Sequence, residues 1–163
     1  MCKNLKKLVL QKMFHVSKKP VLFRDLLEAN AEFNEGMLVD PAKLNFKFRY
    51  GMSYMIFGIF ILVILFPASA LTHAFFTKID VHISLLAMIV ATSAVFIGFD
   101  CFKAWARKEL THELIKKAWE NHFLYFPYEK YSQIVEQIYD EAVKNEIPKR
   151  DLEKYVLDKL VQK

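Results

Sequence analysis

Residues 50–77 read YGMSYMIFGIFILVILFPASALTHAFFT and contain no Asp, Glu, Lys or Arg. Residues 81–99, VHISLLAMIVATSAVFIGF, also lack these charged side chains. About 20 apolar residues in a helix cross a hydrocarbon core about 30 Å thick, whereas a surface helix of a soluble protein keeps a polar face. The sequence therefore predicts two transmembrane helices that form a hairpin at about 50–104, with spans at 50–76 and 81–102 and an outer turn at 77–80.

The segments on either side of this hairpin carry helical patterns. In residues 1–49 we expect a basic amphipathic helix and a second helix, and a further helix that starts at Asp40-Pro41 and runs into the first span. In residues 105–163 the strongest pattern is Tyr131, Ile134, Val135 and Ile138, which recur at i, i+3, i+4 and i+7. With predicted helices at 105–125 and 149–161, this region forms a small three-helix domain. The fold class is all-α, and no strand is predicted.

Cationic side chains predict the orientation of the hairpin, because Lys and Arg near the ends of a span stay in the cytoplasm. One lysine, Lys78, lies in the outer turn, and eight cationic residues flank the other ends of the spans: Lys43, Lys47, Arg49, Lys103, Arg107, Lys108, Lys116 and Lys117. Both termini should therefore be cytoplasmic. We expect a multi-pass protein of a bacterial inner (plasma) membrane, with an organelle membrane as the less favoured alternative.

The net charge of +5 at pH 7 is explained by cationic residues that face anionic lipid headgroups, so no nucleic-acid partner is inferred. The first 24 residues contain no acidic side chain. Leu5, Leu8, Val9 and Met13 can form one face of a helix that lysines largely surround, which is typical of a helix lying on a membrane surface. An ordinary solvated segment is an equal alternative.

Small residues in the second span recur at steps of three and four, as in helices that pack closely in lipid. They are Ser84, Ala87, Ala91, Ala94 and Gly98, with Gly51 and Gly58 of the first span as possible mates. We call these seven residues the small-residue seam. The seam could pack within the hairpin or against another protein, and a random scatter of small residues remains an alternative.

Three polar residues could carry chemistry within or near the spans. Asp100 should lie at the cytoplasmic interface, where Lys103 at i+3 can pair with it, and a proton or ion role is the alternative. His73 and His82 flank the outer turn. They are interpreted as interfacial polar residues, with a haem or metal pair as the less favoured reading.

No phosphate loop, nucleophile motif or cysteine cluster is recognisable, so neither enzymatic activity nor a cofactor, a metal or a small-molecule substrate is predicted. We expect a non-enzymatic accessory subunit, assembly factor or scaffold of a larger membrane complex, bound to other subunits or to itself. Aromatic and apolar residues of the C-terminal region are its candidate partner-binding side chains: Trp119, Phe123, Tyr125, Phe126, Tyr131 and Ile138. The alternative is an oligomeric transport or redox subunit that handles protons, ions or haem.

Overall fold

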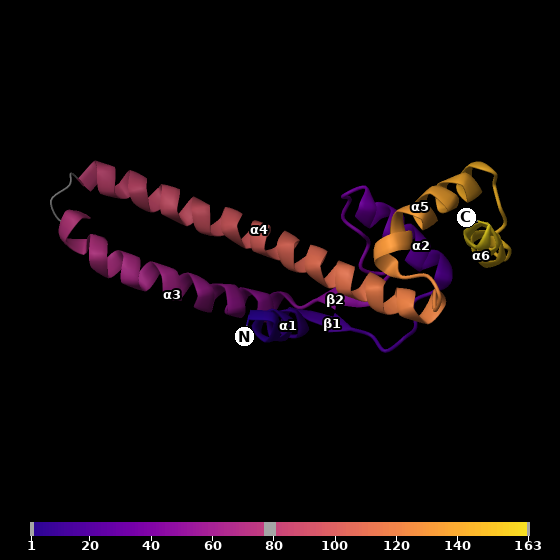
Figure 1. The fold of residues 1–163 in the computed structure, drawn as a ribbon. Coiled ribbons are helices and arrows are strands. Elements are labelled where there is room, and N and C mark those ends of the chain that lie inside the picture. Colours follow the sequence, from indigo (N-terminus) through magenta and orange to yellow (C-terminus); the bar gives the residue numbers. More distant parts are fainter. Residues whose placement is uncertain (1, 77–80, 163) are drawn as a thin grey trace. The chain divides into compact units, whose positions relative to one another are not determined.

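The computed structural model describes residues 2–76 and 81–162, and 75% of this structure is helical. The all-α prediction is therefore confirmed, although two short strands accompany the helices (Figure 1). The described elements are α1 (Cys2–Met13), β1 (Phe14–Val16), α2 (Phe23–Asn34), β2 (Phe46–Phe48), α3 (Tyr50–Phe76), α4 (Val81–His122), α5 (Tyr128–Lys144) and α6 (Leu152–Val161).

The two strands correct the prediction of a continuous helix from Asp40 into the first span. They pair in an antiparallel register, since the Arg49 amide donates to the Met13 carbonyl at 2.8 Å and the Ser17 amide donates to the Asn45 carbonyl at 2.8 Å. Asn45 has a φ of 55°, a left-handed conformation that does not continue a helix. The chain therefore turns before β2, and α3 begins only at Tyr50.

One compact unit, which we call the hairpin unit, comprises the described residues up to Phe14 and Phe48–Arg107. It contains α1, α3 and the first part of α4. Helix α1 packs against α3, and its Leu10 and Met13 side chains are buried. Helices α3 and α4 are both long and apolar enough to cross a membrane. We call α3 and residues 81–107 of α4 the apolar helix pair.

The second compact unit, which we call the mixed unit, comprises residues 15–47 and 108–162. Apolar side chains of α5, including Val135 and Ile138, are buried, and α5 packs against both α2 and α6. The buried Asn30 of α2 donates a hydrogen bond from Nδ2 to the Ser132 carbonyl of α5 at 2.9 Å. The sequence patterns predicted that residues 105–163 form a domain of their own. In the structure, α2 also packs against α5 and α6 and shares their core.

Candidate interaction surfaces

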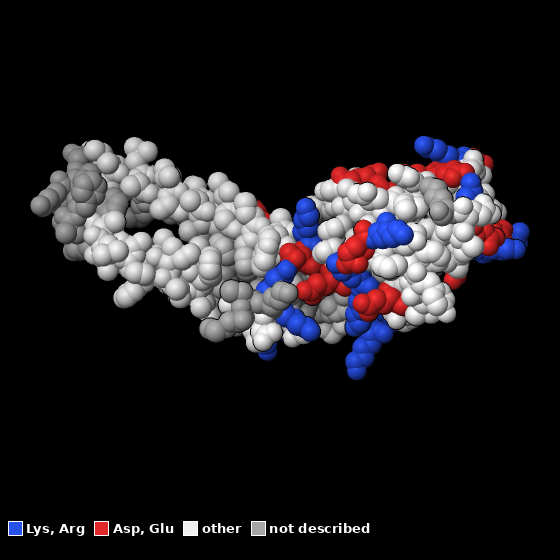
Figure 2. All heavy atoms as spheres, viewed as in Figure 1, with Lys and Arg blue, Asp and Glu red and all other residues white. Residues whose placement is uncertain are grey.

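The apolar helix pair exposes most of its described side chains. In the most apolar window of each helix, 6% is buried inside the structure, whereas the core helix of a soluble protein is mostly buried. Apart from residues drawn in grey, the visible face of this pair is white along most of its length (Figure 2). An exposed apolar surface of this extent marks a site that lipid or another protein covers.

Aromatic side chains hold α3 and α4 together near one end of the pair. The Tyr54 and Phe99 rings are stacked, with centroids 4.5 Å apart and an interplanar angle of 14°. Phe57 contacts both Phe99 and Phe102, at centroid distances of 5.3 and 5.5 Å. Ring pairs at these distances add to the stabilisation that comes from burial alone. The sequence does not predict this cluster, because aromatic residues spaced along two apolar helices do not reveal which of them meet.

The small-residue seam meets this cluster at one position. A Cβ added to Gly98 would lie 3.6 Å from Cζ of Phe57, so the glycine lies directly against the ring. Ser84, Ala87 and Gly58 are half-buried, whereas Ala91, Ala94 and Gly51 are exposed. The middle of the seam is therefore left uncovered within this chain.

The candidate polar residues of the spans do not form a metal site within the described part of the chain. Asp100 is exposed, and its carboxylate lies 3.0 Å from the Lys103 ammonium, the ion pair that the spacing predicted. These two side chains border a hollow of about 260 Å³ that is otherwise lined by Tyr54, Phe57, Val95, Phe96 and Phe99. His82 is exposed, and the side chain of His73 lies outside the described residues. Among described residues, no three His, Cys, Asp or Glu side chains are grouped to hold a metal.

Three of the candidate partner-binding residues belong to the core of the mixed unit. Trp119, Phe123 and Ile138 are buried, and Trp119 Nε1 donates a hydrogen bond to the Phe126 carbonyl at 2.6 Å. Burial removes these three side chains from the surface, so a partner cannot contact them in this structure. Their role is to pack the helices, since buried aromatic and aliphatic side chains supply most of the stabilisation of a small core.

The remaining three candidates lie closer to the surface. Phe126 and Tyr131 are half-buried, and their rings meet edge to face at 5.1 Å. Tyr125 is 89% exposed, and the neighbouring Leu124 is also exposed. These two residues lie between α4 and α5 and form an exposed apolar tip that the sequence indicated only through Tyr125.

A charged pair lies close to this tip. The Lys116 ammonium is 2.7 Å from the exposed carboxylate of Glu129, and this hydrogen bond holds the pKa of Glu129 below its ordinary value. Burial raises the pKa of the neighbouring Tyr128 phenol, so its hydroxyl stays protonated well above neutral pH. A hollow beside the tip is lined by this ion pair, by both Tyr125 and Tyr128, and by a further acidic residue, Glu120.

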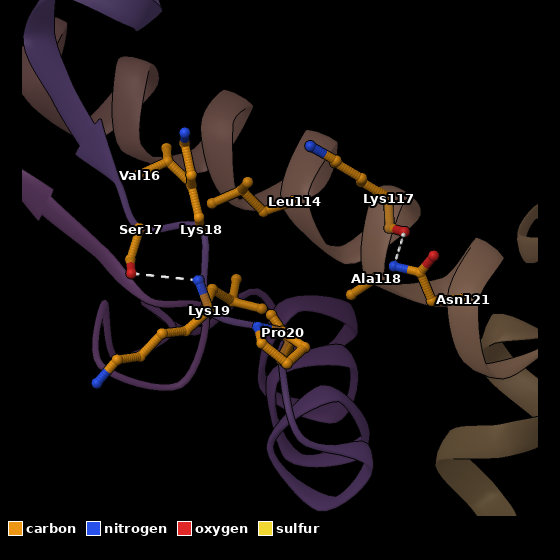
Figure 3. A pocket seen from close by; sticks show the side chains of 11 residues that line it. Val16, Ser17, Lys18, Lys19, Pro20, Leu114, Lys117, Ala118 and Asn121 are labelled. Atoms are coloured by element: carbon orange, nitrogen blue, oxygen red, sulfur yellow. Dashed lines mark hydrogen bonds between the residues drawn. The ribbon is translucent and has the colours of Figure 1, made fainter.

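A second hollow of the mixed unit, of about 240 Å³, lies between the segment that follows β1 and the end of α4. Residues 16–21 line one side, and Leu114, Lys117, Ala118 and Asn121 line the other (Figure 3). The Lys19 amide donates to Ser17 Oγ at 3.3 Å, which shapes the turn. Lys18, Lys19 and Lys117 give the hollow a cationic lining, although the side chain of Lys19 points away from α4 in Figure 3. The acid-free first 24 residues predicted a membrane-surface helix or a solvated segment, and this hollow was not predicted.

Neither a family model nor a curated protein nor a solved structure matches this chain.

Proposed function

We propose that this chain is an integral membrane protein that crosses the bilayer twice through α3 and the first part of α4. The observation that supports it most strongly is the exposure of two long apolar segments, residues 50–76 and 81–99, which carry no Asp, Glu, Lys or Arg, with 6% of the most apolar window of each helix buried inside the structure. The core helix of a soluble protein would be covered by its own protein. A signal sequence would lie near the N-terminus, whereas both windows lie far from the start of the chain. Lipid is the solvent that such a surface requires.

The insertion is tested by extracting membranes from expressing cells at alkaline pH. An integral protein stays in the membrane pellet under these conditions, and a peripheral one is released. Recovery of most of the intact chain in the supernatant would contradict the proposal.

The proposed orientation has both termini in the cytoplasm of a bacterial inner membrane. It rests on the eight cationic residues near the cytoplasmic ends of the spans, against the single Lys78 in the outer turn. A topology reporter fused after Lys163 and one inserted at Lys78 should report opposite sides of the membrane. A reporter at Lys163 that becomes active outside the cytoplasm would reverse the orientation.

The role that we propose is that of an accessory subunit, assembly factor or scaffold in a larger membrane complex. Ala91 and Ala94 lie exposed in the middle of the small-residue seam, where another helix can approach closely. The exposed Leu124 and Tyr125 offer a second contact outside the apolar helix pair. Asp100 is paired with Lys103, so no observation favours the alternative of a transport or redox subunit.

The seam is tested by adding volume. Ala91→Leu should weaken association with a neighbouring helix by about 1–3 kcal/mol, the usual cost of overpacking. The measurement is cross-linking in the membrane through a cysteine at Ala94, in a chain that lacks its native cysteines, with the mass of the adduct separating self-association from a foreign subunit. Ser93→Leu is the matched control, because Ser93 is also small and exposed but lies off the seam. Equal cross-linking in the two variants would show that the seam is not an interface.

A further inference from the structure

Helix α1 has two apolar faces, and the protein covers only one of them. Leu10 and Met13 are buried where α1 packs against α3. Leu5 and Leu8 are 65% and 55% exposed. Together with Lys12 they follow one another at i, i+3 and i+7, so they form one stripe along the helix. This differs from the single face expected from the sequence, which placed Met13 with Leu5 and Leu8.

The position of α1 within the hairpin unit is fixed at the start of α3. The Met13 carbonyl accepts a hydrogen bond of 2.8 Å from the amide of Arg49, the residue that precedes α3. In Figure 1, α1 is seen foreshortened beside this end of α3, whereas α3 runs across the picture. The axes of α1 and α3 are therefore not parallel. If α3 spans the bilayer, α1 departs from the direction of the span at this end, as a helix on the membrane surface does.

Exposed tyrosines mark the same level of α3. Tyr50 and Tyr54 both lie in its first two turns, and both are exposed. Tyrosine is enriched where the hydrocarbon meets the headgroups, because its ring is apolar and its hydroxyl is polar. The exposed leucines of α1 are thus attached to the part of α3 that suits the interface.

The charged side chains of α1 are all of one sign. The helix carries Lys3, Lys6, Lys7 and Lys12 and no Asp or Glu, and Lys7 and Lys12 are exposed. Lysine can lay its aliphatic stem on an apolar surface while its ammonium reaches phosphate groups. A cationic helix with an apolar stripe is complementary to a surface of anionic lipid.

We infer that α1 is an interfacial helix that inserts Leu5 and Leu8 into an anionic leaflet while its lysines contact the lipid phosphates. This inference rests on the proposed function, since it requires α3 to span the same membrane. It assigns to the hairpin unit a lipid-binding surface in addition to its spans. The lipid would fix the angle at which α3 enters the bilayer.

The test uses the full chain with Cys2→Ser and Cys101→Ser, reconstituted in nanodiscs of phosphatidylcholine with or without phosphatidylglycerol. A polarity-sensitive fluorophore is attached at Leu8→Cys, and Val143→Cys, which replaces a side chain of similar exposure (58%), is the control. With phosphatidylglycerol, the probe at position 8 should be quenched by nitroxide-labelled lipid and protected from aqueous iodide. The probe at position 143 should remain open to iodide in both lipids.

The charge contribution is measured with a second variant. Near an anionic surface a lysine contributes about 1 kcal/mol, so Lys12→Gln should lower the ratio of inserted to free α1 about fivefold. This ratio is read from the two fluorescence lifetimes of the probe, and Lys154→Gln, an exposed lysine of α6, should leave it unchanged.

The outcomes separate this inference from the proposed function. A probe at position 8 that iodide reaches in both lipids, in a chain that resists alkaline extraction, would overturn the inference and leave the spans intact. A probe protected equally in both lipids would overturn the role of anionic lipid. A chain that alkaline buffer extracts would overturn the proposed function itself.

Discussion

The hairpin unit and the mixed unit differ in whether their apolar side chains are exposed or buried. Along α3 and the first part of α4, large apolar side chains such as Phe60, Phe66 and Phe96 face outward. In α5 the apolar residues Val135 and Ile138 are buried, and polar residues such as Gln133 and Gln137 are exposed. The pattern of α5 suits water, whereas the exposed apolar surface of α3 and the first part of α4 suits the lipid that we propose surrounds it.

This difference follows from the arrangement of apolar residues around each helix. Helix α3 is apolar on every face, so no single neighbouring helix could cover it. Helix α5 has one apolar stripe, which α2 and α6 cover. An exposed apolar residue is thus informative only in the context of its helix, and the same substitution should have different effects in the two units.

The largest effect is expected from Ile138→Asp in the core of the mixed unit. Ile138 is 1% exposed, so the carboxylate would be buried without a partner. We expect a loss of more than about 4 kcal/mol, enough to unfold a marginally stable unit. The measurement is limited proteolysis of the detergent-purified chain, with the mixed unit degraded, including residues 15–47, and the apolar helix pair retained.

Val143→Asp, on the same helix, is the control for this prediction. Val143 is exposed, and a substitution at such a position changes stability by about 0.5 kcal/mol or less. Equal resistance of the two variants to protease would mean that α5 is not packed as described.

The next effect contrasts two valines of nearly equal exposure. Val90 in α4 is 62% exposed and Val143 in α5 is 58% exposed. If lipid surrounds Val90, an aspartate there costs about 2.5–3.5 kcal/mol of insertion free energy, the value for a charge near the middle of a spanning helix. We expect Val90→Asp to lower the fraction that resists alkaline extraction and Val143→Asp to leave it unchanged. Equal fractions would contradict a lipid environment for α4.

The sequence predicted the parts of the fold that depend on local patterns. Two charge-free segments of sufficient length predicted α3 and the apolar part of α4, and helical spacing predicted α5. The strands were missed, although Phe46-Lys47-Phe48 alternates in the way that strands do, because an alternation of three residues is too short to outweigh a helical start signal at Asp40-Pro41.

Contacts between distant segments could not be predicted. The hydrogen bond from Asn30 joins residues 102 positions apart, and no periodicity within α2 or α5 reveals it. The sequence does not separate surface from core among the candidate partner-binding residues for a related reason: Trp119 and Tyr125 are both aromatic residues near a helix end, but one is buried and the other exposed. Only the packing of the neighbouring helices decides between them.

A smaller effect is expected where α2 joins this core. Asn30→Leu removes the donor that lies 2.9 Å from the Ser132 carbonyl, while Asn34 Nδ2 remains at 3.4 Å. A buried carbonyl that loses its partner costs about 1–3 kcal/mol. The loss of Asn30 Oδ1, which is buried without a hydrogen-bond partner, offsets part of this cost. We expect about 1 kcal/mol of destabilisation in the thermal unfolding of the mixed unit.

Asn34→Ala is the control, because Asn34 is exposed and its hydrogen bond to Glu136 is solvent-accessible. Its effect should be within about 0.5 kcal/mol. A larger loss in Asn34→Ala than in Asn30→Leu would show that the exposed residue, and not the buried one, joins α2 to α5.

The smallest effect concerns the ion pairs of Lys43 in the mixed unit and appears only at alkaline pH. Burial lowers the pKa of the Lys43 ammonium, but hydrogen bonds to Glu32 and Glu28 outweigh this, so the pKa lies above its ordinary value of 10.5. Because the folded state favours the proton, the stabilisation is complete below pH 10.5 and is lost as the pH rises through the folded-state pKa.

Lys43→Met should cost less than about 1 kcal/mol at neutral pH, as is usual for partly exposed ion pairs. Burial also raises the pKa of Tyr128 and Tyr139 above the ordinary 10.0, so the native protein and the variant should both lose stability in alkali. The measurement is the unfolding free energy of the mixed unit between pH 9 and pH 12, where the variant should decline less steeply. Parallel declines would mean that Lys43 releases its proton at the same pH in the folded and unfolded states, and that its carboxylate partners do not hold it.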